Sequence, residues 1–331
     1  MTGKNAMKVT VMPAGHGDSI LVQCDDFNIL VDSGPHNAKI HKRVYSALVS
    51  ALNGRPIDLA IVTHHDDDHI GGLERMLNNS TLSVRALLFN SPNLIHEHID
   101  RAEEVNVSAR QAINVATKLK PCNAKAVVAG DELNFFDGRI TLSVLSPWSK
   151  DILKFGPGMI AAIGKEESVG SLGRETPICG RIDELLSQFD DNKASDKSEA
   201  NALSLAFILT FEERSILFLG DSWPSRVTPF LAMLSDGGAR IPLDMVFVSH
   251  HGSKNNTTVE LYSNIETERY VISTDGKQNP DVETFGRILR AAAPKRPEFY
   301  FSERTYQLET MFSRSDINVR FPGDCPLTFH L

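Results

Sequence analysis

Residues 62–72, VTHHDDDHIGG, hold the densest group of chemically reactive side chains in the sequence. Positions 64–69 within this segment are all His or Asp. On a plain surface loop these groups would repel one another or compete for protons, whereas together they offer nitrogen and oxygen donors for a divalent metal ion. The alternative is an acidic turn or a helix cap, since Asp suits both.

Further reactive residues follow other apolar runs that are typical of buried strands. Residues 220–222, GDS, follow SILFL; residues 250–253, HHGS, follow MVFVS; and Asp32 ends the run ILVD. Ligand-binding residues gather at strand ends in α/β sheets because the loops converge there on a rigid platform. Although an Asp in a Gly-Asp-Ser turn is by itself an ordinary turn residue, the recurrence at several strand ends predicts one shared metal site.

The elements that must position these residues follow an α/β rhythm of short apolar runs and amphipathic stretches. Strands are predicted at residues 8–14, 19–23, 27–34, 59–65, 85–90, 125–130, 140–147, 203–211, 215–222, 243–253 and 269–276. Helices are predicted at residues 41–52, 109–119, 182–189, 224–234 and 282–293. The second half of the chain therefore repeats the organisation of the first half.

Length and composition set the limits of this interpretation. The 331 residues are 41% hydrophobic, which fits one large globular domain over residues 1–331. Residues 151–199 are glycine-rich and charged, and are predicted to be a surface insertion that forms either an exposed loop or a lid. The formal charge of 34 − 42 = −8 argues against a protein that coats polyanions. The scattered cysteines and the lack of a long apolar stretch favour a cytoplasmic protein without membrane association.

The motifs GHGDS, VDSG, THHDDDHIGG, GDS and HHGS, in this order, resemble those of the metallo-β-lactamase superfamily. The resemblance is strongest to the branch related to the hydrolase domain of the DNA-uptake competence protein ComEC. It extends from residue 9 to about residue 293, apart from residues 151–199. It implies an α/β fold of the αβ/βα type, a four-layer sandwich of two facing mixed β-sheets flanked by helices, with a metal site at one edge.

The main superfamily motif, H-x-H-x-D-H, corresponds here to H-x-D-x-D-H over residues 64–69. A carboxylate at Asp66 in place of an imidazole raises the preference for Mn²⁺ or Mg²⁺ relative to Zn²⁺, which also remains open. The resemblance implies one or two divalent ions, zinc or manganese, with Asp221 as a bridge between two positions. One position would be held by His64, Asp66 and a third-motif residue, and the other by Asp68, His69 and the fifth-motif His.

The third motif departs from the superfamily pattern. The only histidines between His69 and Asp221 are His96 and His98, in a stretch that looks like a helical or loop excursion. The ComEC-like branch resembles N-x-x-S at this point, which matches Asn201 and Ser204 in NALSLAF. Asn201 would bind a metal weakly through its amide oxygen or orient the attacking water, so that a site with one tightly held ion is also open.

Two neighbouring histidines compete for the fifth-motif role. His251 directly precedes a glycine, as the metal His does in similar turns of the superfamily, so we expect His251 to be the ligand. His250 would then hydrogen-bond a ligand or face the substrate. Asp32 is expected to hydrogen-bond a ligand His rather than bind metal. His16, in GHGDS, either faces the site or caps its turn.

The predicted chemistry is hydrolysis by metal-activated water, with Asp66, Asp68 and Asp221 as the catalytic carboxylates. The sequence contains neither a G-x-S-x-G elbow nor a G-x-x-x-x-G-K-[ST] loop, so it gives no support to a serine hydrolase or a P-loop nucleotidase. The ComEC-like resemblance implies a phosphodiester substrate, either nucleic acid or a nucleotide derivative. The alternatives are a lactone, thioester or β-lactam hydrolase, and a metal-binding sensor that does not turn over substrate.

Substrate contacts are expected from the residues that follow the HHGS turn. Ser253 and Lys254 lie next to the predicted site, and Lys254 with Lys277 could hold one phosphate or be ordinary solvated lysines. The net charge offers no global basic track of the kind that a nuclease usually needs. The oligomeric state is left open by the sequence.

Overall fold

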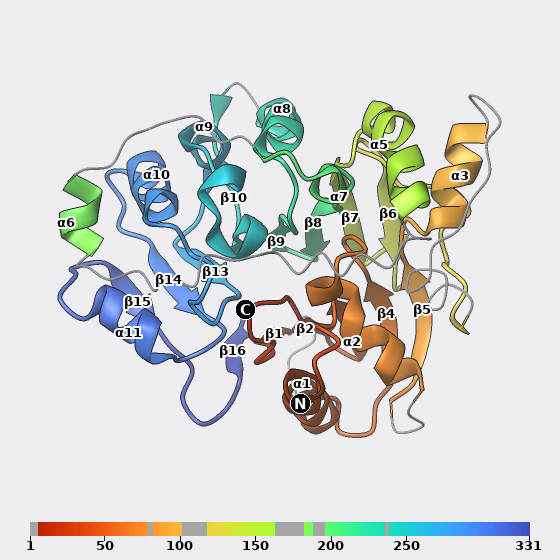
Figure 1. The fold of residues 1–331 in the computed structure, drawn as a ribbon, viewed down its shortest axis with the longest axis horizontal. Coiled ribbons are helices and arrows are strands. Elements are labelled where there is room, and N and C mark those ends of the chain that lie inside the picture. The colour runs from red at the N-terminus through yellow and green to blue at the C-terminus, as the bar shows by residue number, and fades with distance from the viewer. Residues whose placement is uncertain (1–5, 79–81, 101–117, 163–181, 188–195, 236–237) are drawn as a thin grey trace.

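The computed structural model describes residues 6–78, 82–100, 118–162, 182–187, 196–235 and 238–331. Two β-sheets face each other between two layers of helices (Figure 1). The predicted four-layer αβ/βα sandwich is therefore confirmed.

The first sheet has six strands and is mixed. Its order is β16 (Leu327–His330), β1 (Met7–Val11), β2 (Ile20–Cys24), β3 (Phe27–Val31), β4 (Ile57–Ile61) and β5 (Val84–Leu88). The pairs from β16 to β3 are antiparallel, and β3, β4 and β5 run parallel. The strand nearest the end of the chain thus closes one side of the sheet that the first strands begin.

The second sheet has eight strands and is also mixed. Its order is β15 (Asn318–Arg320), β14 (Glu298–Phe301), β13 (Arg269–Ile272), β11 (Met245–Phe247), β9 (Arg214–Phe218), β8 (Ala206–Phe211), β7 (Ile140–Ser146) and β6 (Glu132–Phe135). The strands from β15 to β9 are parallel, and those from β9 to β6 are antiparallel. A separate short parallel pair joins β10 (Ile241–Pro242) to β12 (Ile265–Glu266).

Alternating apolar side chains build the layers. In β9, Ile216 and Phe218 belong to the core between the two sheets, whereas Leu217 and the following Leu219 belong to the core under the outer helices. Successive strand residues point to opposite faces, so a continuous apolar run marks a strand that is buried on both sides. This double burial explains why runs such as SILFL and MVFV are apolar without alternation.

Helices cover the outer face of each sheet. The first sheet is covered by α1 (Ala38–Leu52) and α2 (Asp67–Leu77). The second is covered by α6 (Ile182–Ser187), α8 (Pro224–Leu234), α9 (Val259–Ser263), α10 (Val282–Ala292) and α11 (Tyr306–Phe312). A third group contains α3 (Pro92–Asp100), α5 (Ser149–Ala162) and α7 (Glu199–Ala202). Among the described residues, no helix combines the length and the apolar character that crossing a membrane requires.

Several predicted elements differ from the observed ones. The strand predicted at residues 125–130 is wrong, because this stretch has no regular structure and the edge strand is β6. The predicted surface insertion at 151–199 begins with most of α5, which packs against α3. The helix predicted at 109–119 lies almost entirely outside the described residues. Helix α2, which begins at Asp67, was not among the predicted helices, and it holds the two glycines of the HIGG segment in its second turn.

Helix α2 lies unusually close to the loop after β3. The Gly72 amide donates to the backbone oxygen of Gly34 at 2.7 Å, and the Ser33 amide donates to the backbone oxygen of His69 at 2.8 Å. A Cβ atom at Gly72 would lie 2.1 Å from the backbone oxygen of Ser33. Only glycine therefore allows the approach that seats the His- and Asp-bearing end of this helix.

We expect Gly72→Ala to lower the free energy of unfolding by about 1–3 kcal/mol, since the new methyl group must push a backbone segment aside. The measurement is urea unfolding of the metal-free protein. Gly323→Ala is the matched control, because a Cβ there meets open space. An unfolding midpoint for Gly72→Ala equal to that of the control would contradict the packing argument.

Candidate metal centre

The site lies where the carboxyl ends of parallel strands from both sheets meet. His64 follows β4, Asp221 follows β9, and His250 and His251 follow β11 in a short 3₁₀ segment, Ser249–Gly252. The Leu205 amide, just before β8, donates to the backbone oxygen of Thr63 at 2.9 Å and ties the two sheets together at this point. Strand ends are rigid, so they fix where the functional side chains begin.

The end of α2 supplies the other residues of the H-x-D-x-D-H motif. Asp66 is the N-cap residue of the helix, but its side chain makes no capping hydrogen bond. Its carboxylate lies instead 3.5 Å from Nε2 of His64. This placement argues against the simple helix-cap interpretation of the acidic cluster.

Left-handed backbone conformations aim several of these side chains. Asp32, His250 and His251 have φ angles of +53°, +48° and +54°. Residues other than glycine rarely adopt this region, and such strain persists only where the surroundings impose it, commonly at functional sites. The two successive left-handed histidines face different carboxylates, because Nε2 of His250 lies 3.6 Å from Asp221 and Nε2 of His251 lies 3.2 Å from Asp68.

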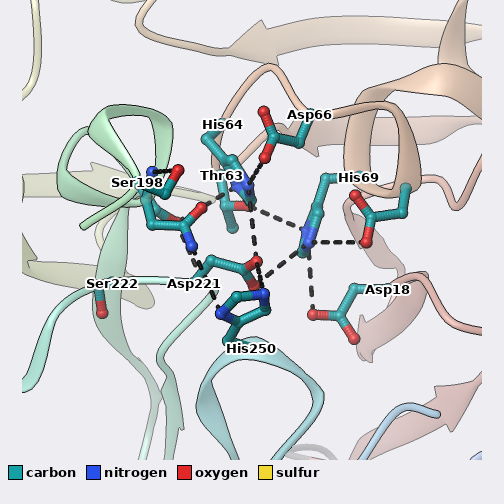
Figure 2. Close-up of polar contacts among 12 residues, drawn as sticks. Asp18, Thr63, His64, Asp66, His69, Ser198, Asp221, Ser222 and His250 are labelled. Atoms are coloured by element: carbon teal, nitrogen blue, oxygen red, sulfur yellow. Dashed lines mark hydrogen bonds and ion pairs between the residues drawn. The ribbon is translucent and has the colours of Figure 1, made fainter. Parts of the chain in front are cut away.

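The side chains converge on Asp221, which is buried (Figure 2). Oδ1 of Asp221 lies 3.3 Å from Nε2 of His69, and Oδ2 lies 3.8 Å from Nε2 of His64. Oδ2 also lies 3.6 Å from Nε2 of His250. The two oxygens of one carboxylate thus face different imidazoles.

A second group lies beside the first. Oδ2 of Asp68 is 3.2 Å from Nε2 of His251 and 3.9 Å from Nε2 of His69. His69 therefore belongs both to the set around Asp221 and to the set around Asp68. Each set offers three ligand atoms within 4.8 Å of one another.

These residues fit a divalent cation. Nε2 of His64, Nε2 of His69 and Oδ1 of Asp221 are buried, yet none has a hydrogen-bond partner among the described residues. Burying unpaired polar atoms is costly. A cation that accepts lone pairs from imidazole nitrogens and carboxylate oxygens would satisfy all three atoms, and this donor set suits first-row divalent metals.

The electrostatics of the cluster point the same way. Burial alone would raise the pKa of Asp221, but the imidazoles of His250 and His69 outweigh it and hold that pKa well below its usual range. Burial would lower the pKa of His251, but a hydrogen bond with Asp68 and the charge of Asp18 raise it to about 9. Protons on the imidazoles thus balance the carboxylates in the metal-free chain, and a bound cation would displace them.

Buried hydrogen bonds orient the imidazoles. Asp32 lies with Oδ2 2.8 Å from Nδ1 of His69, and it also accepts from the Thr63 amide and hydroxyl, both at 2.8 Å. A donor at Nδ1 leaves the Nε2 lone pair of His69 free to face Asp221. His251 is oriented similarly, with Nδ1 3.0 Å from the backbone oxygen of Ser273.

The other residues singled out in the sequence lie as follows. Asn201 is buried beside His250, with Nδ2 3.4 Å from Nδ1 of that ring. His96 and His98 lie on α3 and belong to none of the candidate metal-ligand groups found in the described part of the chain. His16 is partly exposed and belongs to none of the candidate metal-ligand groups found in the described part of the chain.

The residues expected to contact substrate are engaged within the protein. The hydroxyl of Ser253 accepts from the Asn255 amide at 3.2 Å and caps the following turn. Lys254 forms an ion pair with Glu283 at 3.0 Å, and Lys277 forms one with Asp275 at 2.9 Å. Each lysine charge is therefore partly compensated before any phosphate arrives.

Sequence reasoning missed Asp18, Asp196 and Asn256. The two oxygens of Asp18 lie 3.9 Å from Nδ1 of His69 and 3.9 Å from Nδ1 of His251, and burial raises the pKa of this carboxyl despite both imidazoles. Its presence in the quoted GHGDS motif was the available signal. Asp196 lies in a loop and Asn256 in the short 3₁₀ segment Lys254–Asn256, and no sequence pattern distinguished them.

A family model described as the metallo-beta-lactamase superfamily matches residues 12–129. The matched segment contains Asp18, Asp32 and the whole 64–69 motif, and ends before Asp221. This segment is therefore similar to that superfamily. No sequence among the curated proteins matches the chain.

Solved structures with similar folds include the following three. YhfI of Bacillus subtilis, a metallo-beta-lactamase fold protein, is 13% identical, over 99% of this chain and 100% of its own, with a TM-score of 0.45. Zn²⁺-bound PqqB of Methylobacterium extorquens is 11% identical, over 98% and 100%, with a TM-score of 0.49. Igni18 of Ignicoccus hospitalis, a metallo hydrolase, is 13% identical, over 98% and 99%, with a TM-score of 0.43. Similarities this distant carry nothing about activity.

We expect Asp32→Asn to weaken divalent metal binding by about 10–100-fold, because Asn cannot hold Nδ1 of His69 as an acceptor-only carboxylate does. Asn tolerates the left-handed backbone at this position. The measurement is calorimetric titration of the metal-free protein with Mn²⁺ and with Zn²⁺. Asp58→Asn is the matched control, since Asp58 is a buried carboxylate that pairs with Arg85 instead. Equal affinities in the two variants would refute the role given to Asp32.

Proposed function

We propose that this protein is a metal-dependent hydrolase that cleaves a phosphodiester, either nucleic acid or a nucleotide-type molecule, with metal-activated water. The observation that carries the proposal is the buried set of unpaired ligand atoms on His64, His69 and Asp221. Such a set is expensive to bury without a cation. The superfamily match over residues 12–129 supports the same class of protein.

The proposed centre has two cation positions that share Asp221. Position one is the side of Asp221 Oδ2, with Nε2 of His64 and the carboxylate of Asp66. Position two is the side of Asp221 Oδ1, with Nε2 of His69, Asp68 and His251. Zinc and manganese both accept this donor set, and the carboxylate at Asp66 favours the harder manganese ion.

When bound, divalent cations lower the pKa of water toward neutrality and polarise a phosphoryl oxygen. The protein's own groups then position the reactants. Asp221 stays ionised because its pKa is held low, so its carboxylate can accept a hydrogen bond from the attacking water. Burial would raise the pKa of Asp68, but His69 and His251 lower it, so its carboxylate can also accept a hydrogen bond from the attacking water. Asp66, whose side chain is 40% exposed, stands at the side of the cluster that substrate can reach.

A phosphodiester is supported by the ComEC-like pattern H-x-D-x-D-H, N-x-x-S and HHGS. The charge distribution favours a small phosphodiester or a chain end over a long duplex. The net charge is −8, and the two lysines nearest the HHGS turn are paired with Glu283 and Asp275. A duplex would need a continuous basic track along its phosphates.

We expect turnover of bis(p-nitrophenyl) phosphate by the protein loaded with Mn²⁺ or Zn²⁺, and loss of turnover after chelation. Asp221→Asn should lower kcat/KM by about 100-fold or more, because it removes the shared carboxylate. The control is Asp26→Asn, whose side chain is 98% exposed. That variant should keep wild-type turnover.

Absence of phosphodiester turnover in the folded, metal-loaded protein would reject the proposed substrate class. A panel of lactones, thioesters and a β-lactam then separates the remaining possibilities. Turnover of one of these that depends on Asp221 would identify a carboxylic-ester hydrolase. Metal binding without any turnover would identify a sensor.

A further inference from the structure

A buried polar network lies beside His250 and the backbone of Asp221. Asp196 Oδ2 accepts from Nδ2 of Asn201 and from Nδ2 of Asn256, both at 2.7 Å. The other oxygen of Asp196 accepts from the Ser198 amide at 2.8 Å. Asn201 and Asn256 are almost completely buried. One carboxylate thus fixes two side-chain amides.

The orientation of Asn256 determines the tautomer of His250. Nδ2 of Asn256 donates to Asp196 and, at 2.9 Å, to the backbone oxygen of Asp221. Its Oδ1 is therefore the atom 2.8 Å from Nδ1 of His250, so Nδ1 carries the proton and donates. The Nε2 lone pair of His250 is then free, 3.6 Å from Oδ2 of Asp221.

The orientation of the Asn201 amide leaves its Oδ1 without a hydrogen bond among the described residues. Nδ2 of Asn201 donates to Asp196, which directs Oδ1 to the opposite side of the amide. That Oδ1 is buried and has no hydrogen-bond partner among the described residues. An unpaired buried carbonyl oxygen is costly, and amide oxygens are accepted ligands of hard divalent cations. The amide nitrogen of Asn201 also lies 3.4 Å from Nδ1 of His250, so the two side chains are neighbours.

We propose that His250 Nε2 and Asn201 Oδ1 complete position one, and that Asp196 is the positioning residue that holds both. This inference rests on the proposed metal centre. Oδ2 of Asp221 is the common neighbour of Nε2 of His64 and Nε2 of His250. His250 and His251 do not compete for one role, because the divergent left-handed pair sends one ring to each position.

The proposed ligand set makes the two positions unequal. Position one includes a neutral amide oxygen and a partly exposed histidine, whose side chain is 32% exposed. Position two draws on the more deeply buried His69 and His251. Two ions should therefore bind with different affinities, and loss of His250 should affect the weaker one.

The experiment uses the full chain, freed of metal and then titrated with Mn²⁺, with bound ions counted by mass spectrometry after equilibration. His250→Asn tolerates the left-handed backbone and keeps a donor near Nδ1, but lacks the atom at Nε2. His250→Gln returns an amide oxygen near the Nε2 position. His330→Asn, at an exposed histidine of β16, is the control.

We expect two ions in the wild type and in His330→Asn. His250→Asn should lose the weaker ion or bind it about 10–100-fold less tightly, with the tighter ion unchanged, and His250→Gln should recover part of the loss. Asp196→Asn should weaken the same ion, because its amide cannot accept from both asparagines and the Ser198 amide. The visible spectrum of the Co²⁺-loaded protein should change in the His250 and Asp196 variants alike.

Two ions with wild-type affinities in both His250→Asn and Asp196→Asn would overturn the inference, as would equal weakening of both ions. Thermal unfolding of the metal-free variants identifies any that fail to fold, and His250→Gln then takes the place of His250→Asn. Phosphodiester turnover is measured on the same samples. A wild type that binds two ions without turnover rejects the proposed substrate but not the ligand assignment, whereas a wild type that binds none rejects both.

Discussion

The arrangement depends on the burial of Asp221 among other carboxylates. Five aspartates, at positions 18, 32, 66, 68 and 221, gather around a few imidazoles at one edge of the sandwich. Carboxylates removed from water repel one another unless positive charge is placed among them. Despite burial, the carboxylates raise the pKa of His64, His69 and His251, which favours protonated imidazoles in the metal-free chain. Cations would supply the positive charge in the proposed enzyme. The strained turns and close helix contacts nearby serve to hold this cluster together.

The sandwich meets this demand with backbone rigidity. Strands buried on both faces end at one edge, and each contributes one or two residues to the cluster. Helix α2 approaches the β3 loop closely enough that glycine is required at position 72. A second close approach occurs at Gly220, where a Cβ would lie 2.6 Å from Oγ of Ser204, which accepts from the Asp221 amide at 3.0 Å. Small residues therefore allow the candidate ligands to approach one another, and large buried apolar residues hold the strands that carry them.

Much of the platform could be predicted from the sequence, because buried strands and amphipathic helices leave direct apolar patterns. The failed strand at residues 125–130 has a specific cause. The side chain of Asn90 donates to the backbone oxygen of Val127 and accepts from its amide, and so takes the place of a partner strand. The glycines and proline of α5 suggested a loop, but they permit contact with α3, since a Cβ at Gly156 would lie 2.8 Å from Ile95.

The sequence also indicated many residues of the candidate site, but not all of them. Residues at strand ends carry a local signal, and the sequence indicated Asp32, the 64–69 motif, Asp221 and the two histidines after β11. Asp196 and Asn256 are 60 positions apart in the sequence, and only the folded chain brings them together. The directions of the His250 and His251 side chains could not be predicted either, because they depend on left-handed φ angles that no residue pattern indicates.

The hydrogen bond from the Leu205 amide to the backbone oxygen of Thr63 joins the two sheets at the edge that carries the candidate metal centre. Some candidate ligands, such as His64, follow strands of the first sheet, whereas Asp221 and His251 follow strands of the second sheet. A cation bound by residues of both sheets would link the two halves of the sandwich, so its binding free energy would add to the free energy of unfolding. Dissociation of the ion would then require the two sheets to separate locally or the imidazoles to take up protons. The residence time of the ion would therefore depend on the stability of the whole domain.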